Sequence, residues 1–308
     1  MRISAAMIVK NEEVMLPDCL ESIKGLDEIV IVDTGSKDRT VEIAGNYGTV
    51  YHFEWCDDFA AARNFATSKC TGDWIFVIDA DERLKSSVKD LRKAVKSAKD
   101  KKFIMVNVAL CPGNSWDNPE YYQSSIRLFR RIPEIKYDRA IHNTLTLLGS
   151  QVEPRKVSYV SQITMVSGFS PAHMDDPERT FRMLKRQLEL NPDSTRDLYY
   201  LAVEYLYKKQ DGDEALKLLQ RYFALTFYQP WTNELADACY LMATIYVNRK
   251  DWHKAMSSAI TAVMMWHTFK APYVMLSQLC EIAGMVEPAK YWRALSEKVN
   301  NEGVLFVR

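Results

Sequence analysis

No stretch of this sequence is hydrophobic over a length that could cross a membrane. A spanning helix needs about 20 consecutive apolar residues, and no run in the 308-residue chain approaches that length. The first apolar run, Ile3 to Val9, passes directly into the polar segment Lys10-Asn11-Glu12-Glu13 and is too short for a signal peptide. We therefore expect neither a membrane span nor a secretory leader.

The sequence has few cysteines, and none of them has a metal-binding spacing. Its six cysteines, at positions 19, 56, 70, 111, 239 and 280, form no Cys-x-x-Cys or zinc-type pair. We interpret them as reduced and mostly buried thiols. Because reduced cysteines are typical of the cytoplasm, we expect a cytoplasmic location.

The sequence also has no net charge. The 40 Lys and Arg residues balance the 40 Asp and Glu residues, which gives a formal charge of zero. No global field therefore attracts nucleic acid or an anionic membrane, and nucleic acid is disfavoured as a partner. A hydrophobic content of 47% in 308 residues indicates instead a globular protein that is long enough for two domains.

About the first 80 residues alternate between short apolar strands and helical segments. Strands are expected at residues 3–9, 28–33, 49–53 and 74–78, with helical patterns in the segments between them. This alternation is typical of a parallel α/β sheet.

The strand at 74–78 leads into the most informative pattern of the chain. Its five apolar residues are followed by Asp79 and Asp81, which places two carboxylates at the carboxyl end of a buried strand. Open α/β sheets bind ligands at this edge, where acids can hold a divalent cation together with a substrate's phosphates. Either aspartate could instead cap the Lys-rich helix expected after it, because an isolated Asp-x-Asp is common.

Two later segments contain further candidate residues. The loop after a strand at 103–110 combines Pro, Gly and Asn with aromatics and with the acids Asp117 and Glu120. His142 follows an Arg-rich strand at 125–130 and precedes another β segment. A single histidine is usually structural, so a structural role and a metal or phosphate role are about equally open.

About the first 145 residues resemble the family-2 inverting nucleotide-sugar glycosyltransferases, which have the GT-A fold with a Rossmann-like, mostly parallel sheet. Six sequence blocks in the family's order carry this resemblance. They are Ile8-Val9-Lys10-Asn11-Glu12-Glu13, Val32-Asp33-Thr34-Gly35-Ser36-Lys37-Asp38-Arg39-Thr40, Ala62-Arg63-Asn64, Asp79-Ala80-Asp81-Glu82, Arg127-Leu128-Phe129-Arg130 and Ile141-His142-Asn143.

The resemblance implies that the donor is a nucleoside diphosphate sugar, with UDP as the default nucleotide. Glu12 and Asp33 would contact the nucleoside. Arg63 would lie beside the nucleotide, and Asp79 would meet the ribose. The blocks that contain these residues would therefore form one nucleotide site.

The resemblance also implies that Asp81 and His142 hold a divalent metal on the diphosphate. We expect manganese in preference to magnesium, because imidazole favours the softer ion. Relatives often carry an acid directly after this histidine, whereas this chain has Asn143. The candidates for the general base are therefore Asp117 and Glu120, whose loop lies where an acceptor should enter.

From Glu178 onward, after a linker at residues 168–177, the sequence reads as helical and repeats itself. Ala243 and Ser277 occupy equivalent positions 34 residues apart (277 − 243), as do Ala255 and Ala289 (289 − 255). This period is that of tetratricopeptide repeats, which the segment resembles. We predict a catalytic domain over residues 1–170 and an all-α tetratricopeptide-like domain over residues 171–308. The second domain would cap the first or form a homodimer surface, in preference to a peptide-binding groove.

The leading hypothesis is metal-assisted sugar transfer, with inversion, to an acceptor. The acceptor could be a protein side chain, a lipid-linked or envelope saccharide, or a modified base. Nucleotidyl transfer is an alternative, but the sequence lacks the Gly-rich, basic loop after the first strand that a triphosphate would need. A non-catalytic repeat scaffold with a nucleotide-binding domain is the third hypothesis. Retention of the acids and of His142 argues against it.

Overall fold

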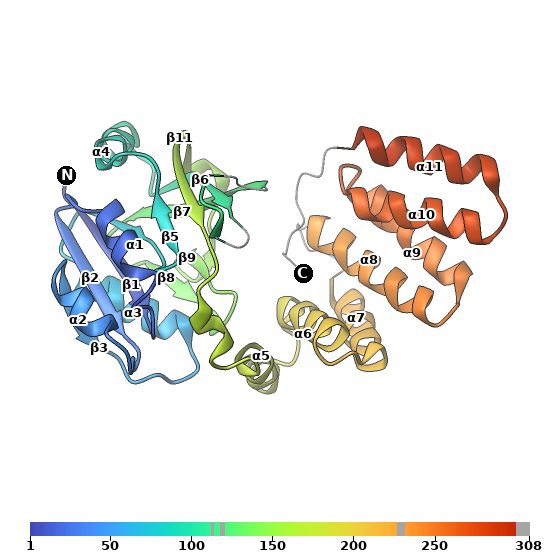
Figure 1. Cartoon of the computed structure of the whole chain (residues 1–308), viewed down its shortest axis with the longest axis horizontal. Helices are drawn as coiled ribbons and strands as arrows, with labels where there is room; N and C mark the ends of the chain where they lie inside the picture. The colour runs from blue at the N-terminus through green and yellow to red at the C-terminus, as the bar shows by residue number, and fades with distance from the viewer. Residues whose placement is uncertain (112–113, 118–120, 227–231, 300–308) are drawn as a thin grey trace. The chain divides into compact units, whose positions relative to one another are not determined.

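The chain forms two compact units, Met1–Arg179 and Thr180–Arg308, which are described separately (Figure 1). The structure is a computed structural model that describes residues 1–111, 114–117, 121–226 and 232–299. The sequence-based expectation divided the chain after residue 170. In the structure, residues 171–179 also belong to the first unit, and within them Asp175 Oδ2 accepts a hydrogen bond from Asn11 Nδ2.

The first unit is built on an eight-stranded sheet in the order β3-β2-β1-β4-β7-β6-β11-β5. The strands from β3 to β4 are parallel, and β7 is antiparallel to both of its neighbours. Strand β11 is parallel to β6 and antiparallel to β5. The bounds are Ile3–Val9 (β1), Glu28–Asp33 (β2), Thr49–His52 (β3), Trp74–Val77 (β4), Glu82–Leu84 (β5), Phe103–Leu110 (β6), Tyr121–Arg130 (β7) and Val157–Ser167 (β11). The parallel half confirms the predicted α/β class.

The short connection between β4 and β5 forces the sheet to curl. Only residues 78–81 separate the two strands, and at about 3.5 Å per residue they bridge at most roughly 17 Å. Strands β7, β6 and β11 lie between β4 and β5, and four strand spacings of about 4.8 Å amount to roughly 19 Å. The curl brings the loop at 78–81 beside the end of β11, where the Gly168 N–H donates to the Asp81 carbonyl over 2.8 Å.

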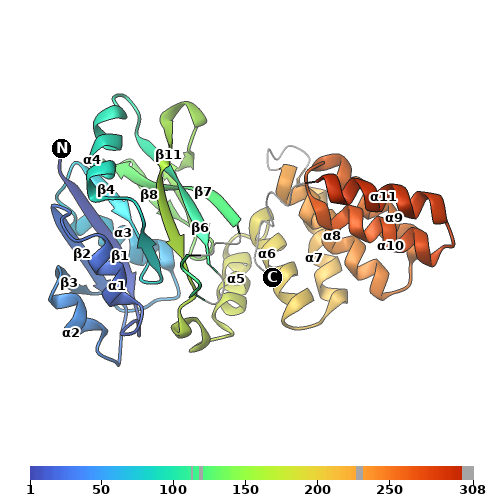
Figure 2. The ribbon, with the colours of Figure 1, turned by 45° about the horizontal axis from the view of Figure 1, so that its top comes forward.

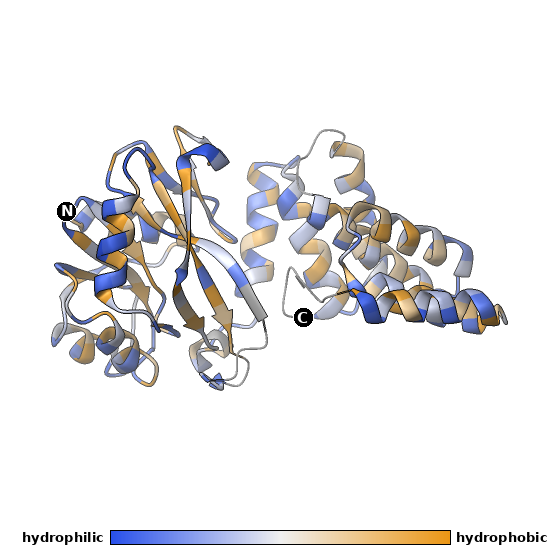
Figure 3. Cartoon of the chain, turned by 90° about the horizontal axis from the view of Figure 1, so that it is seen from above, coloured by the Kyte–Doolittle hydropathy of each residue, from blue (hydrophilic) through white to orange (hydrophobic). Residues whose placement is uncertain are grey.

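Alternate residues of the central strands pack on opposite faces of the sheet. On β1, Ala5 and Met7 belong to a core shared with α1 and α4, whereas Ala6 belongs to a core shared with α3, β8 and β9. Figure 3 shows the hydrophobic stretches along these strands. The helices span Leu16–Ser22 (α1), Thr40–Gly45 (α2), Phe59–Lys69 (α3) and Val88–Ser97 (α4). A separate antiparallel sheet consists of Ile135–Asp138 (β8), Thr144–Leu147 (β9) and Ser150–Gln151 (β10).

Helix α4 is capped by Ser87, and neither Asp79 nor Asp81 caps it. The Ser87 side chain accepts the Asp90 N–H, and the Asp90 side chain accepts the Ser87 N–H, which together form a capping box. The alternative interpretation of the Asp-x-Asp as a cap for this helix is therefore wrong. Both aspartates lie instead in the connection between β4 and β5.

The second unit contains helical hairpins, in which α6 packs against α7, α8 against α9 and α10 against α11 (Figures 1 and 2). The residues that predicted a repeat lie in the contacts between these helices. Ala243 and Ala255 are fully buried, and the Ser277 hydroxyl donates to the Ala289 carbonyl over 2.9 Å. The helices span Arg179–Leu190 (α5), Thr195–Tyr207 (α6), Gly212–Leu225 (α7), Thr232–Asn248 (α8), Trp252–Met265 (α9), Lys270–Ile282 (α10) and Val286–Lys298 (α11). This arrangement confirms the predicted all-α repeat domain.

Across the described residues, no helix is both long enough and apolar enough to span a bilayer. All six cysteines are free thiols. Five of them are buried and Cys56 is exposed, as expected for mostly buried, reduced cysteines.

Candidate active site

The loops that follow β1 and β2 are hydrogen-bonded to each other. The Asn11 N–H donates to Ser36 Oγ over 3.0 Å, and Asn11 Oδ1 accepts the Lys37 N–H over 2.9 Å. The Glu12 N–H donates to Thr40 Oγ1 over 2.7 Å. Asn11 has a φ of 55°, a left-handed conformation that asparagine tolerates better than most residues. The two motif blocks after β1 and β2 thus form one structural unit at the carboxyl edge of the sheet.

Asp33, the last residue of β2, organises the turn that follows it. Asp33 is 4% exposed, and its carboxylate accepts the N–H groups of Gly35 and Ser36 over 3.2 and 3.0 Å. His52 Nδ1 lies 3.4 Å from Asp33 Oδ2. Gly35 has a φ of 106°, which a residue with a side chain rarely adopts. The carboxylate is thereby held at the strand end, where the sequence placed a nucleoside contact.

Arg63 and Asp79, both predicted nucleotide residues, contact each other directly. Arg63 Nη2 donates to Asp79 Oδ1 and Oδ2 over 2.8 and 3.0 Å, and the guanidinium lies 5.6 Å from the centre of the Tyr137 ring. Asn64, next to Arg63, exchanges two 2.8 Å hydrogen bonds with the backbone of Tyr137. The Ala62-Arg63-Asn64 block therefore joins α3 both to β8 and to the loop after β4.

Glu82 and Arg127 form an ion pair that supports the loop after β4, although the sequence analysis assigned them no role. Arg127 Nη2 donates to Glu82 Oε1 over 2.5 Å, and the Asp79 N–H donates to Glu82 Oε2 over 2.9 Å. Burial raises the pKa of Glu82 to about 7; the Arg127 charge acts in the opposite direction, and Asp79 and Asp81 add to the rise. The Glu82 side chain is 3% exposed. Glu82 and Arg127 both lie within the sequence blocks that resemble the family, and this position was the one sign in the sequence that they could have a role.

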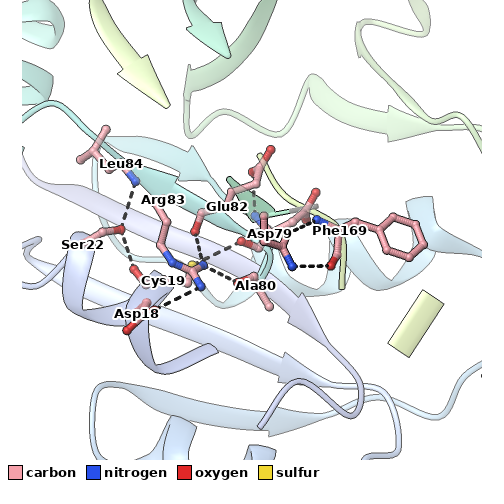
Figure 4. Close-up of polar contacts among 10 residues, drawn as sticks. Asp18, Cys19, Ser22, Asp79, Ala80, Glu82, Arg83, Leu84 and Phe169 are labelled. Atoms are coloured by element: carbon pink, nitrogen blue, oxygen red, sulfur yellow. Dashed lines mark hydrogen bonds and ion pairs between the residues drawn. The ribbon is translucent and has the colours of Figure 1, made fainter. Parts of the chain in front are cut away.

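The same loop is held by Arg83 of β5 and by Cys19 of α1 (Figure 4). Arg83 Nη1 donates to the carbonyls of Ala80 and Glu82 over 2.9 and 2.8 Å. The buried Cys19 thiol lies 3.3 Å from the Asp79 carbonyl, to which it donates. These contacts fix the backbone that carries the two aspartates before any ligand binds.

The carboxylate of Glu12 is close enough to the two aspartates to be influenced by them electrostatically. Glu12 is 8% exposed, and its Oε2 accepts the Ser170 hydroxyl over 2.7 Å. Burial raises its pKa to about 7; the Ser170 hydrogen bond lowers it, and the charges of Asp81 and Asp79 raise it. Three of the predicted site residues therefore form one cluster of interacting acids.

Glu12→Gln is expected to stabilise the ligand-free protein at pH 8. Because the folded-state pKa of Glu12 is raised from 4.5 to about 7, the folded protein binds this proton more tightly than the unfolded chain. The resulting stability is fully present below pH 4.5 and is lost as the pH rises through about 7. The shift corresponds to roughly 3 kcal/mol at pH 8, and urea unfolding between pH 4 and 8 measures it. Glu21→Gln, an exposed control on α1, should keep the pH dependence of the wild type. An unchanged pH dependence in Glu12→Gln would show that this carboxyl does not carry the raised pKa.

The predicted metal ligands lie on two separate turns. Asp81 is 9% exposed and precedes β5. His142 is half-buried and follows β8, with a φ of 48°. Its turn is attached to the start of α3, because the Phe59 N–H donates to the Ala140 carbonyl over 2.8 Å. In the described part of the chain, no group of three or more His, Cys, Asp or Glu residues is arranged to hold a metal ion. Two protein ligands completed by substrate oxygens therefore remain the predicted arrangement.

The two predicted general bases, Asp117 and Glu120, come after β6 in the sequence. The Asp117 side chain is 91% exposed, with its Oδ1 3.2 Å from Lys85 Nζ. Glu120 lies outside the described residues. Asp117 is accessible to solvent, and its role as the base stays a prediction.

Comparison with known proteins gave matches to both halves of the chain. Residues 4–154 match the family model described as glycosyl transferase family 2. A TPR repeat-containing protein of Synechococcus elongatus is 33% identical over 228 residues, which cover 72% of this chain and 55% of that protein. The SPbeta prophage-derived glycosyltransferase SunS of Bacillus subtilis is 24% identical over 266 residues, which cover 81% of this chain and 60% of SunS.

Among solved structures, S. aureus TarS 1–349 in complex with UDP-GlcNAc aligns with 97% of this chain and 92% of its own. The sequence identity is 15% and the TM-score is 0.44. The chain spans somewhat more than half the length of the two curated relatives it matches, 55% and 60%.

Proposed function

Residues 4–154 form a glycosyl transferase family 2 domain, and from this premise we propose that the chain transfers a sugar from a nucleoside diphosphate sugar, with inversion. One observation carries the proposal. Glu12, Asp79 and Asp81 follow the parallel strands β1 and β4, and the charges of both aspartates raise the pKa of Glu12. Crevices at the carboxyl ends of parallel strands are where open α/β sheets bind ligands.

The nucleotide part of the donor, UDP in this proposal, occupies the edge formed by the loops after β1, β2 and β4. Glu12 and Asp33 accept hydrogen bonds from the nucleoside, and Asp79 accepts those of the ribose. Arg63 lies beside the nucleotide and orients the Asp79 carboxylate through its 2.8 Å and 3.0 Å contacts. These acceptors are oriented before the donor arrives, which reduces the entropy cost of binding.

The cluster of acids suits a divalent cation, because mutually repelling carboxylates are stabilised by a positive charge between them and the diphosphate. Asp81 and His142 would hold manganese, or less well magnesium, which would supply the positive charge that neutralises the departing diphosphate. The acceptor attacks from the face opposite the diphosphate and transfers its proton to Asp117 or Glu120. Asp117 is open to an approaching acceptor, since its side chain is 91% exposed.

The helical unit contributes no residue to this chemistry in our proposal. It stabilises the first unit, forms a homodimer or presents an acceptor such as a protein or a saccharide. Donor hydrolysis, assayed with and without manganese, separates the alternatives: a glycosyltransferase releases UDP, a nucleotidyltransferase releases UMP, and an inactive scaffold releases neither.

Isothermal titration with UDP tests the nucleotide site. Asp33→Ala and Arg63→Ala should each weaken binding by about 10- to 100-fold, since a lost hydrogen bond to a charged group costs roughly 1.5–3 kcal/mol. The matched control is Arg92→Ala, which removes a similar Arg–Asp pair formed with Asp27 outside the site and should leave the affinity unchanged. If both site variants stay within about twofold of the wild type, the nucleotide binds elsewhere.

A further inference from the structure

We propose that residues 168–175, called the strap below, hold the donor-site loops in place and that Ser170 is a positioning residue for Glu12. The inference rests on the proposed donor site. The strap follows β11 and precedes α5, so in sequence it is far from every motif block.

The Ser170 hydroxyl is oriented toward Glu12 by a second hydrogen bond. Ser170 Oγ accepts the Ala172 N–H over 3.2 Å, and this leaves its proton to be donated to Glu12 Oε2 over 2.7 Å. Ser170 is 1% exposed and Glu12 is 8% exposed, so water competes little for this contact. The two residues are 158 positions apart in the chain. The contact therefore holds the Glu12 carboxylate in one orientation before a nucleotide binds.

The strap also binds the loop that carries Asp81 and the loop after β6. The Gly168 N–H donates to the Asp81 carbonyl over 2.8 Å. Asn114 Oδ1 accepts the Phe169 N–H over 2.8 Å, and Asn114 Nδ2 donates to the Phe169 carbonyl over 3.2 Å. Figure 4 shows the Phe169 backbone engaged in two hydrogen bonds.

Gly168 lets the strap approach these loops closely. A Cβ at this position would lie 2.3 Å from Asn114 Oδ1 and 2.5 Å from the Trp116 ring. At its far end, the strap accepts a 2.8 Å hydrogen bond from Asn11 Nδ2 to Asp175 Oδ2. One segment thus contacts the loops after β1, β4 and β6. Loops are the most mobile parts of most folds, and cross-linking three of them at the site pre-organises it.

Ser170→Ala in the full chain tests the proposal with two measurements. Hydrogen–deuterium exchange of the ligand-free protein should show faster exchange at residues 10–13. The dissociation constant for UDP at pH 7.5 should rise roughly five- to tenfold, while the melting temperature stays near that of the wild type. Because the Ser170 hydroxyl lowers the pKa of Glu12, its loss raises that pKa. The pH below which UDP affinity declines should therefore move upward.

Ser86→Ala is the matched control, because Ser86 Oγ also donates one hydrogen bond, to the Gln162 carbonyl, and accepts one, from the Thr164 N–H. It should change neither measurement. Asn114→Ala, at a half-buried position, removes the two hydrogen bonds to Phe169. It is the variant with which the strap is tested if Ser170→Ala does not fold. It should speed exchange across residues 168–170 and weaken UDP binding.

The two proposals can fail separately. If the wild type binds no UDP, the proposed donor is wrong, and the exchange data still decide whether the strap orders these loops. Exchange at residues 10–13 that is the same in Ser170→Ala and Ser86→Ala overturns the strap. The proposal for the strap is also overturned if the wild type binds UDP and Ser170→Ala changes neither the UDP affinity nor its pH profile. This holds whatever the exchange data show.

Discussion

Asp81→Asn is expected to reduce sugar transfer by about 10²–10³-fold or more, the loss that follows when one element of electrostatic stabilisation is removed from a reaction. Asparagine keeps the shape of the side chain, and the backbone bond from Gly168 to the residue 81 carbonyl is retained. The change therefore removes a charge while the fold is preserved. Initial rates of donor turnover against manganese concentration measure the effect.

His142→Ala should act differently, because in our proposal His142 contributes only to metal binding. The manganese concentration for half-maximal turnover should rise, while UDP affinity without metal stays nearly unchanged. Electron paramagnetic resonance of Mn²⁺ with UDP should show weaker metal binding in this variant, and His253→Ala, an exposed control in α9, should match the wild type. A crystal with manganese and UDP that places His142 more than about 5 Å from the ion, against the roughly 2 Å of a metal–imidazole bond, would contradict the assignment.

Arg127→Met is expected to destabilise the first unit by about 3–5 kcal/mol, because it leaves the buried Glu82 carboxylate without its ion pair. The pKa of Glu82 is already raised to about 7, and loss of the arginine raises it further. A raised carboxyl pKa contributes stability at low pH that is lost as the pH rises, so the destabilisation should be larger at pH 8 than at pH 6. Urea unfolding at both pH values measures it.

The double variant Arg127→Met/Glu82→Gln should recover much of the stability, since no buried charge is then left unpaired. The amide oxygen of the introduced glutamine can still accept the Asp79 N–H, so this contact with the loop should remain. Arg39→Met breaks an exposed pair with Glu42 and serves as the control, with an expected cost under about 1 kcal/mol. Equal stability of Arg127→Met and the wild type at pH 8 would mean that Glu82 is not held as an ion pair.

Local patterns were sufficient to predict the elements of the fold. The run from Trp74 to Ile78 predicted a buried strand, and Trp74–Val77 forms β4, the strand at which the parallel half of the sheet meets β7. Ala243 and Ser277 predicted a helical repeat, and both lie buried in the helical hairpins. These predictions rest on a continuous apolar run and on a spacing of 34 residues, which can be seen in the sequence without knowledge of the tertiary structure.

The sequence by itself also determined which chemical groups end the strands. Glu12, Asp33 and Asp79 are predicted to form one nucleotide site because the motif blocks occur in the family's order. Parallel strands bring their carboxyl ends to one edge, so acids that follow them in sequence must meet in space. The expected meeting of these acids at one edge follows from the direction of the strands, whereas their nucleotide role follows from the resemblance.

Only the tertiary structure decided which side chains support these acids. Glu82 and Arg127 are 45 residues apart, and Glu12 and Ser170 are 158 apart, so no local pattern relates either pair. The first pair forms because β7 lies antiparallel beside β4. The second forms because the short connection before β5 curls the sheet and brings the end of β11 to the site. Strand register and sheet curvature depend on the packing of the whole unit, and a hydrogen bond that requires atoms within about 3 Å is therefore determined only when that packing is complete.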